Sequence, residues 1–158
     1  MKSKKLGVIV PYRNRRTHLQ QFIPSISKHL DKQKIRHEII VVERSDDKAF
    51  NRGKLLNIGV QKALTLKCDY VALHDVDMLP IDVDYSYVNR PTHLATDFVS
   101  DEGEKRVIFD GYFGGVTLFP IMDYYKVNGY SNDYWGWGYE DDDILFRCKE
   151  NFFDLNLK

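Results

Sequence analysis

Short apolar runs alternate with amphipathic stretches through the first half of the chain, and this alternation limits the fold more than any other feature. Each run is partly β-branched and bounded by polar residues or proline, as buried strands are. The runs are residues 6–10, 38–43 and 70–74. Stretches of helical spacing separate them, which predicts strand–helix–strand units and a parallel sheet. The sequence therefore predicts an α/β fold that binds its ligands in the crevice outside the strand ends.

Each of the two predicted helices in this half carries one apolar face. Thr17 is suited to cap the first helix, and Pro24 predicts a kink inside it. The apolar face of the first helix consists of Leu19, Phe22, Ile23, Ile26 and Leu30. The face of the second consists of Leu56, Val60, Ala63 and Leu64. This spacing indicates that both helices pack against the sheet.

The second half of the chain is less regular. Its predicted strands are residues 93–96, 107–109 and 112–119. Gly114-Gly115 inside the last of these indicates a bulge or the close approach of a ligand. A short helix over 121–127 is expected to end near Asn128-Gly129. A final helix is expected to place four residues on its inner side, namely Ile144, Leu145, Cys148 and Phe152.

The charges of the chain balance, with 23 Lys and Arg residues against 23 Asp and Glu residues. No net field favours a nucleic acid or an anionic membrane as partner, and no apolar run has the length of a membrane span. Pro11 interrupts the first apolar run, so a secretory signal is not predicted. Cys68 and Cys148 lie far apart, which is typical of free thiols in a reducing compartment. These features predict a single cytoplasmic domain over 1–158.

Two carboxylates, Asp75 and Asp77, follow the third predicted strand. They would share one face if the strand geometry continued beyond His74. Hard oxygen ligands suit Mg²⁺ or Mn²⁺, which proteins often hold with one or two carboxylates plus substrate phosphates. Because Asp-x-Asp is also common in turns, these residues alone leave two interpretations open. One is a metal–diphosphate site, and the other is a pair of solvated aspartates.

Basic residues follow the first strand and open the second helix. Arg13, Arg15 and Arg16 lie where guanidinium groups could bind phosphate at a strand end, and a solvated turn is the alternative. Arg52 and Lys54 lie at a helix start, where the helix dipole disfavours cations. Either an anion binds there or the first turn is simply basic.

Both tryptophans, Trp135 and Trp137, alternate with glycines just before four consecutive acids at 140–143. Acids in a first turn stabilise a helix, but they do not explain the aromatic repeat. Aromatic faces stack on sugar rings, and nearby carboxylates accept hydroxyl protons. The stretch therefore favours a saccharide site.

Five motifs in this order resemble the β-1,4-galactosyltransferase family. They are residues 10–15 (VPYRNR), 50–57 (FNRGKLLN), 75–77 (DVD), 112–115 (YFGG) and 135–143 (WGWGYEDDD). The resemblance implies a glycosyltransferase A-type fold, with a mixed, mostly parallel sheet and helices on both faces. It also implies inverting transfer of galactose from UDP-galactose to a saccharide hydroxyl in β-1,4 linkage, with Mn²⁺ as cofactor or Mg²⁺ as the alternative. His74 before the third motif is most similar to the branch that acts on xylose in proteoglycan linkers.

The resemblance also assigns roles to individual residues. The implied donor contacts are Pro11, Tyr12, Arg13, Phe50, Arg52, Asp75, Val76, Tyr112 and Gly115. Asp77 matches the metal ligand. Trp137, Glu140 and Asp141 match acceptor-binding residues, with Asp141 as the expected general base. Residues 1–80 are then the nucleotide-binding half of the domain and 81–158 its acceptor-binding half.

The sequence departs from the family pattern in three places. Gly53 replaces a usual alanine, and Tyr139 replaces a usual glycine or arginine beside the acids. The family supplies further metal ligands, including a histidine, from a segment beyond the position of Lys158, so weak metal binding by this chain is expected. One alternative is a UDP-N-acetylgalactosamine transferase, which Tyr112 disfavours beside the 2-position of the sugar. Another is a truncated, non-catalytic sugar- or nucleotide-binding domain. For a fragment of a eukaryotic member, the expected location is the Golgi lumen.

Overall fold

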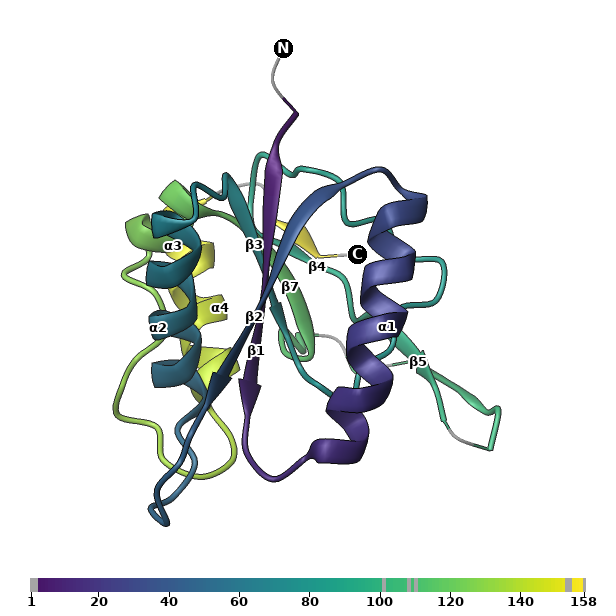
Figure 1. The fold of residues 1–158 in the computed structure, drawn as a ribbon. Coiled ribbons are helices and arrows are strands. Elements are labelled where there is room, and N and C mark those ends of the chain that lie inside the picture. Colours follow the sequence, from purple (N-terminus) through teal and green to yellow (C-terminus); the bar gives the residue numbers. More distant parts are fainter. Residues whose placement is uncertain (1–2, 101, 108, 110, 153–154, 158) are drawn as a thin grey trace.

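The computed structural model describes residues 3–100, 102–107, 109, 111–152 and 155–157. Its strands are β1 (Lys5–Tyr12), β2 (Arg36–Glu43), β3 (Tyr70–His74), β4 (Thr92–His93), β5 (Asp97–Val99), β6 (Lys105–Val107), β7 (Val116–Pro120) and β8 (Asn156–Leu157). Its helices are α1 (Arg16–Lys32), α2 (Arg52–Thr65), α3 (Ile121–Lys126) and α4 (Glu140–Asn151). Figure 1 shows a central sheet between helices, with β5 and β6 forming a separate small sheet at one side. The predicted α/β fold is confirmed.

The central sheet has the strand order β2-β1-β3-β7-β4-β8 among the described residues. Strand β1 pairs in parallel with β2 and β3, and β8 pairs in parallel with β4, whereas β7 is antiparallel to both of its neighbours. The predicted mixed, mostly parallel sheet is therefore confirmed. Because Ile9 of β1 lies opposite Leu73 of β3, the two strands end at the same edge of the sheet. This carboxyl edge carries Arg13 after β1 and Asp75 after β3.

Helices cover both faces of the sheet, as predicted (Figure 1). Helix α1 packs on one face through Phe22, Ile26 and Leu30. Helices α2, α3 and α4 contribute to a second core on the other face. Within it, Gly59 of α2 lies so close to β1 that a Cβ atom would clash with Ile9. Glycine thus lets α2 sit tightly on the strand, which fixes the start of α2 at the carboxyl edge.

Two details of the first helices differ from prediction. The N-cap of α1 is Arg15, and not Thr17, because the chain turns at Asn14 with a φ of 51° and the helix begins earlier. Ile23 and Leu64, predicted on the apolar faces, are exposed. Both lie at the margin of a helix face. The residues at the centre of that face make the contacts to the sheet.

The predicted strands of the second half are shorter than expected. Strand β7 begins only at Val116, because Gly115 adopts a left-handed φ of 71° and interrupts the extended chain. Strand β4 (Thr92–His93) overlaps the predicted 93–96 stretch only at His93. For the predicted strand at 107–109, β6 ends at Val107, Ile108 lies outside the described residues, and Phe109 is not in a strand.

The remaining predictions for this half hold. Helix α3 is followed by Asn128 and Gly129, both with positive φ, as a helix end of this type requires. All four predicted inner residues after the acidic run are buried. Cys68 and Cys148 are buried free thiols.

A buried polar network fixes the end of β3. The Nδ1 atom of His74 donates to the Asp75 carbonyl at 2.9 Å, so its Nε2 atom accepts from the Tyr85 hydroxyl at 2.8 Å. Tyr70 in turn donates to the Tyr85 carbonyl at 2.8 Å. Burial lowers the pKa of His74 to about 4, which matches a neutral ring in these two bonds.

We expect this histidine to make the fold less stable in acid. Its pKa is about 4 in the folded chain and about 6.5 in an unfolded one, so the unfolded chain binds more protons between these values. The stabilisation is complete above about pH 6.5 and lost as the pH falls to about 4, a change of about 3 kcal/mol. Urea unfolding at a series of pH values should give a flatter profile for His74→Gln than for the unsubstituted chain. Equal pH dependence in the two proteins would contradict this assignment.

Candidate active site

Arg52, the first residue of α2, joins the carboxyl edge of the sheet to the start of α4. The helix begins there because Asn51 caps it, its side chain accepting the Lys54 N–H at 2.8 Å. Arg52 donates from Nε to Asp75 Oδ1 at 2.8 Å and from Nη1 to Asp141 Oδ1 at 2.9 Å. Its side chain is only 12% exposed, which strengthens both charge-assisted bonds. The anions at this helix start are therefore carboxylates of the chain itself.

Burial dominates the electrostatics of this cluster. It raises the pKa of Asp75, while the charge of Arg52 opposes that rise. Burial also raises the pKa of Glu140, whose Oε1 atom lies 4.0 Å from Arg52 Nη1. Arg52 is thus the cation that allows the acid after β3 and the acids of α4 to lie together.

Asp141 accepts hydrogen bonds at Oδ1 and places Oδ2 beside Gly114. The Tyr130 hydroxyl donates to Asp141 Oδ1 at 2.7 Å. At Gly114, an added Cβ atom would clash with Asp141 Oδ2 and with the Tyr112 hydroxyl. Burial raises the pKa of Tyr112 to about 12, so this hydroxyl stays neutral. Glycine therefore lets a carboxylate oxygen and a phenol approach this loop closely, and both groups can bind a hydroxylated ligand.

The loop over 112–115 is anchored to two strands of the sheet. The Asp75 N–H donates to the Gly115 carbonyl at 2.9 Å. His93 of β4 donates from Nε2 to the Gly114 carbonyl at 2.9 Å and lies edge-on to the Tyr112 ring. The structure thus brings together the predicted residues Asp75, Tyr112 and Gly115 beside the acids of α4.

Arg13 and Phe50 lie side by side beyond the ends of β1 and β2. The Arg13 guanidinium is 5.4 Å from the centre of the Phe50 ring, and it donates to the Lys48 carbonyl at 2.6 Å. Pro11 is buried and Tyr12 half-buried at the end of β1. The predicted donor turn therefore meets the predicted second nucleotide contact.

The tryptophan loop over 134–138 lies against the same region. The Gly136 N–H donates to the Phe50 carbonyl at 2.7 Å, and the Arg44 guanidinium lies 5.2 Å from the Trp135 ring centre. Trp137 is 99% exposed. Its ring is thus open to a ligand, next to residues predicted to hold the donor.

The strand geometry that would have placed Asp75 and Asp77 on one face ends at His74, and the chain turns at 76–77. Val76 is buried, Asp77 is exposed, and Asp75 is paired with Arg52. The described residues contain no group of three or more His, Cys, Asp or Glu side chains that could hold a metal. Asp77 is therefore the carboxylate that this turn offers to a divalent cation. Such a site fits Mn²⁺ or Mg²⁺ when a diphosphate and water supply most of the ligands.

Three residues of the site were not predicted from the sequence, namely His93, Tyr130 and Asn57, which donates to the Tyr130 carbonyl at 2.8 Å. Asn57 belongs to the 50–57 motif, and a polar side chain within a mostly apolar helix face was a usable signal. His93 was assigned only to a strand. Tyr130 follows the Asn128-Gly129 turn without any periodic pattern that marks it.

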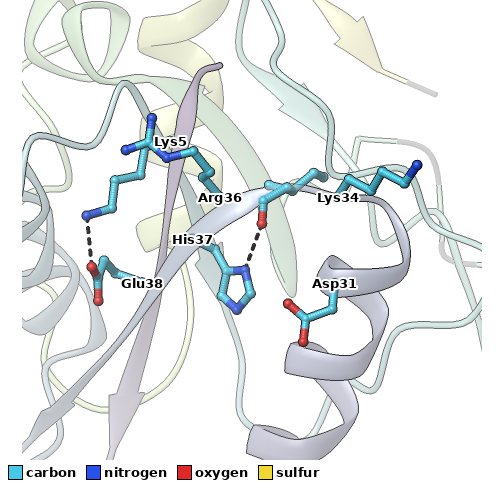
Figure 2. Close-up of a pocket in the computed structure, with 7 residues that line it drawn as sticks. Lys5, Asp31, Lys34, Arg36, His37 and Glu38 are labelled. Atoms are coloured by element: carbon cyan, nitrogen blue, oxygen red, sulfur yellow. Dashed lines mark hydrogen bonds and ion pairs between the residues drawn. The ribbon is translucent and has the colours of Figure 1, made fainter. Parts of the chain in front are cut away.

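A hollow of about 520 Å³ lies at the other end of the sheet, where β1 and β2 begin (Figure 2). It is lined by Lys5, Asp31, Lys34, Ile35, Arg36, His37 and Glu38. Lys5 pairs with Glu38 at 2.8 Å, and His37 donates to the Ile35 carbonyl at 2.9 Å. Several of its polar groups thus already have partners within the chain, and none of the predicted site residues lies here.

The sheet, its helices and the polar carboxyl edge define an α/β domain of the class that binds nucleotides outside its strand ends. Residues 1–90 match the family model described as the N-terminal region of glycosyl transferase group 7. Residues 96–156 match the model described as the N-terminal domain of galactosyltransferase. The chain belongs to the β-1,4-galactosyltransferase family, which confirms the resemblance carried by its five motifs.

Individual relatives agree with this assignment. Xylosylprotein 4-beta-galactosyltransferase of Caenorhabditis elegans is 37% identical over 151 residues, which are 96% of this chain and 52% of the relative. Beta-1,4-galactosyltransferase 4 of Homo sapiens is 39% identical over 149 residues, which are 92% of this chain and 43% of the relative. The chain thus spans about half the length of these curated relatives.

Solved structures confirm the glycosyltransferase A-type fold. The catalytic domain of Drosophila β1,4-galactosyltransferase 7 in complex with xylobiose matches with a TM-score of 0.87 and 34% identity. The match covers 97% of this chain and 64% of that chain. A mutant of the same Drosophila enzyme was solved with manganese, UDP-Gal and xylobiose. In this chain, no helix of the described residues has the length and apolar character needed to cross a membrane.

Proposed function

We propose that this domain transfers galactose from UDP-galactose to a saccharide hydroxyl, with inversion and formation of a β-1,4 linkage. The observation that carries the proposal is the Arg52 bridge, which joins Asp75 on the donor side to Asp141 on the acceptor side. Membership of the family and the manganese–UDP-Gal complex of the Drosophila relative support this donor and this metal. In this proposal, residues 1–80 hold the nucleotide and residues 81–158 the acceptor.

Asp141 acts as the general base of the transfer. The acceptor oxygen forms a bond to the anomeric carbon from the face opposite the nucleotide, and its proton passes to the Asp141 carboxylate. The bond between the anomeric carbon and the diphosphate oxygen breaks, and UDP leaves with the electron pair. Mn²⁺ bound with Asp77 supplies positive charge beside the UDP phosphates. A second catalytic acid is then unnecessary, in contrast to a glycosidase.

The remaining predicted residues bind the two substrates. The Arg13 fork and the Phe50 ring are suited to the phosphate and to the base or ribose of UDP. The exposed Trp137 ring offers a stacking face for the acceptor, whose hydroxyl groups Glu140 can bind. The Tyr112 ring beside the donor sugar disfavours an acetamido group, and thus UDP-N-acetylgalactosamine.

A non-catalytic sugar- or nucleotide-binding domain is the second candidate function. Its specific support is the pairing of Arg13 with the Phe50 ring, a contact that suits a nucleotide and does not use the Asp141 carboxylate.

Calorimetry and a UDP-release assay test the proposal. We expect the chain to bind UDP, to bind Mn²⁺ weakly alone, and to bind Mn²⁺ more tightly with UDP, because Asp77 supplies one ligand and the diphosphate several. Asp77→Asn should remove this UDP-dependent metal binding, whereas the exposed Asp82→Asn serves as the matched control. Manganese-dependent release of UDP from UDP-galactose with one sugar of an acceptor panel supports transfer. UDP binding without release for any sugar favours the non-catalytic domain, and tight Mn²⁺ binding without UDP contradicts a one-carboxylate site.

A further inference from the structure

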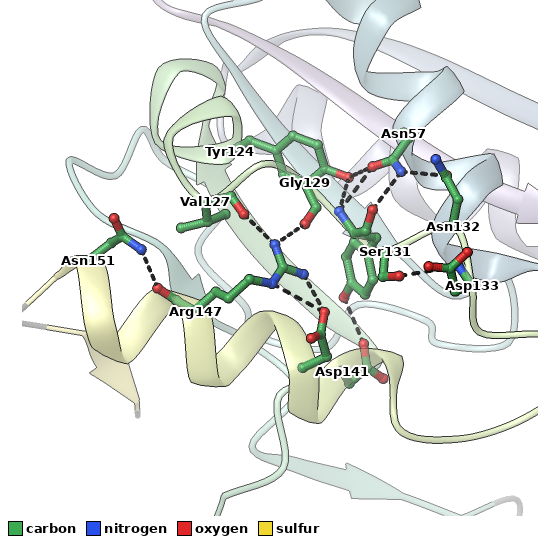
Figure 3. Close-up of polar contacts among 12 residues, drawn as sticks. Asn57, Tyr124, Val127, Gly129, Ser131, Asn132, Asp133, Asp141, Arg147 and Asn151 are labelled. Atoms are coloured by element: carbon green, nitrogen blue, oxygen red, sulfur yellow. Dashed lines mark hydrogen bonds and ion pairs between the residues drawn. The ribbon is translucent and has the colours of Figure 1, made fainter.

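Tyr130 is a buried tyrosine whose backbone is fixed by residues of two helices. Asn57 of α2 accepts the Tyr130 N–H at 3.0 Å and donates to the Tyr130 carbonyl at 2.8 Å. Arg147 of α4 donates to the Gly129 carbonyl at 2.5 Å and so holds the preceding residue (Figure 3). Tyr130 itself is only 2% exposed. Its ring therefore has a defined place between α2 and α4.

The Tyr130 hydroxyl is directed at the proposed base. Its oxygen lies 2.7 Å from Asp141 Oδ1, within the range of a strong hydrogen bond to a carboxylate. Burial raises the pKa of Tyr130, and the Asp141 charge adds to the rise, so the hydroxyl remains a donor throughout the neutral range. Arg52 donates to the same Oδ1 atom at 2.9 Å. Two donors thus occupy one carboxylate oxygen, while Oδ2 lies close against Gly114 and the Asp141 side chain remains 21% exposed.

We propose that Tyr130 is a positioning residue for Asp141, which together with Arg52 fixes Oδ1 so that Oδ2 faces the acceptor hydroxyl. A single donor would leave the carboxylate free to rotate about its Cβ–Cγ bond, and the Arg52 fork is shared with Asp75. Two donors arriving from different elements define that rotation. The inference rests on the proposed function of Asp141 as general base. Tyr130 also contacts Arg52, whose guanidinium lies 5.7 Å from the centre of its ring, and it does not itself take part in the transfer.

Tyr124 provides a matched control for Tyr130. It is also a buried tyrosine, 2% exposed, in the same polar network (Figure 3). Its hydroxyl donates to Asn57 Oδ1 at 2.6 Å and accepts a weak bond from the Tyr130 N–H at 3.4 Å, and the described contacts of Tyr124 do not include Asp141. Tyr130→Phe and Tyr124→Phe therefore each remove one buried hydroxyl, but only the first removes a donor to the base.

The first test compares the transfer kinetics of the two variants. Tyr130→Phe should lower kcat about tenfold, a loss typical of a slightly misplaced catalytic group, without changing the Kd for UDP or the KM for the donor. Tyr124→Phe should leave kcat within about twofold. Equal losses of kcat in both variants would show a merely structural role and overturn the proposal, as would an unchanged kcat in Tyr130→Phe.

The second test does not depend on turnover. Tyr130→Phe should lower the melting temperature less in an Asp141→Ala background than in the unsubstituted chain, because the shared bond is already lost. Tyr124→Phe should cause the same shift in both backgrounds. Identical shifts for Tyr130→Phe would show that the bond to Asp141 is not made, which overturns the proposal. If the unsubstituted chain releases no UDP, the proposed function fails, and this cycle still decides whether Tyr130 holds Asp141.

Discussion

Asp141→Asn is expected to lower the rate of galactose transfer by about 10²–10⁴-fold, because an amide cannot take the proton of the acceptor hydroxyl. The amide oxygen still accepts the bonds that Asp141 Oδ1 receives from Tyr130 and Arg52, so the local structure should persist. UDP affinity should change little, since the described contacts of the proposed nucleotide residues Arg13 and Phe50 do not include Asp141. The loss should therefore appear in kcat.

The neighbouring acid supplies the control for this prediction. Asp142 follows Asp141 in the first turn of α4, carries the same charge and is exposed. Asp142→Asn should keep its transfer rate, so any general effect of lost negative charge at this helix start is measured separately. Steady-state kinetics and calorimetric titration with UDP provide the two quantities. Loss of UDP binding in Asp141→Asn, with Asp142→Asn normal, would show that Asp141 binds the nucleotide or its metal and is not the base.

The elements of the fold could be predicted because their apolar periodicity is set by the sheet. Strands β1, β2 and β3 are short apolar runs, and α1 and α2 bury one side each, so local pattern and tertiary packing agree. The prediction of a strand over residues 112–115 was wrong, because there the local pattern and the tertiary packing disagree. The aromatic and glycine residues of this stretch suit a strand by composition, but the chain needs the left-handed Gly115 to place its carbonyl against the Asp75 N–H.

The residues of the candidate site were found through motifs, whereas their partners were not. Spacing along the chain placed Asp75 and Asp77 at a strand end, but it could not show that Asp75 pairs with Arg52 while Asp77 faces solvent. Arg52 and Asp141 lie 89 positions apart, and nothing local links them. Tyr130 depends on Asn57 and Arg147, from two other elements, for its position. Long-range polar contacts of this kind become visible only once the elements are assembled.

Arg52→Met is expected to destabilise the fold and abolish transfer together, because it leaves Asp75, Asp141 and Glu140 close to one another without their cation. Removing one partner of a buried ion pair typically costs about 3–5 kcal/mol, and the partial exposure of Asp75 reduces the expected loss to about 2–3 kcal/mol. Methionine retains most of the apolar stem, so the loss reports mainly on charge. Arg52→Lys keeps the charge but not the guanidinium fork. Its stability and transfer rate should therefore lie between those of Arg52→Met and the parent.

Unfolding by urea measures the loss, and Arg16→Met is the matched control, since Arg16 is likewise the first residue of its helix but is exposed. The sign of the pH dependence identifies the cause. Without Arg52 the folded carboxyl groups hold their protons more tightly than those of the unfolded chain, which favours folding as the pH falls. The gap in stability between Arg52→Met and the parent should therefore narrow from about pH 7 towards about pH 5. A gap that stays constant with pH would show that Arg52 acts through packing, and the charge bridge between Asp75 and Asp141 would then not be what organises this site.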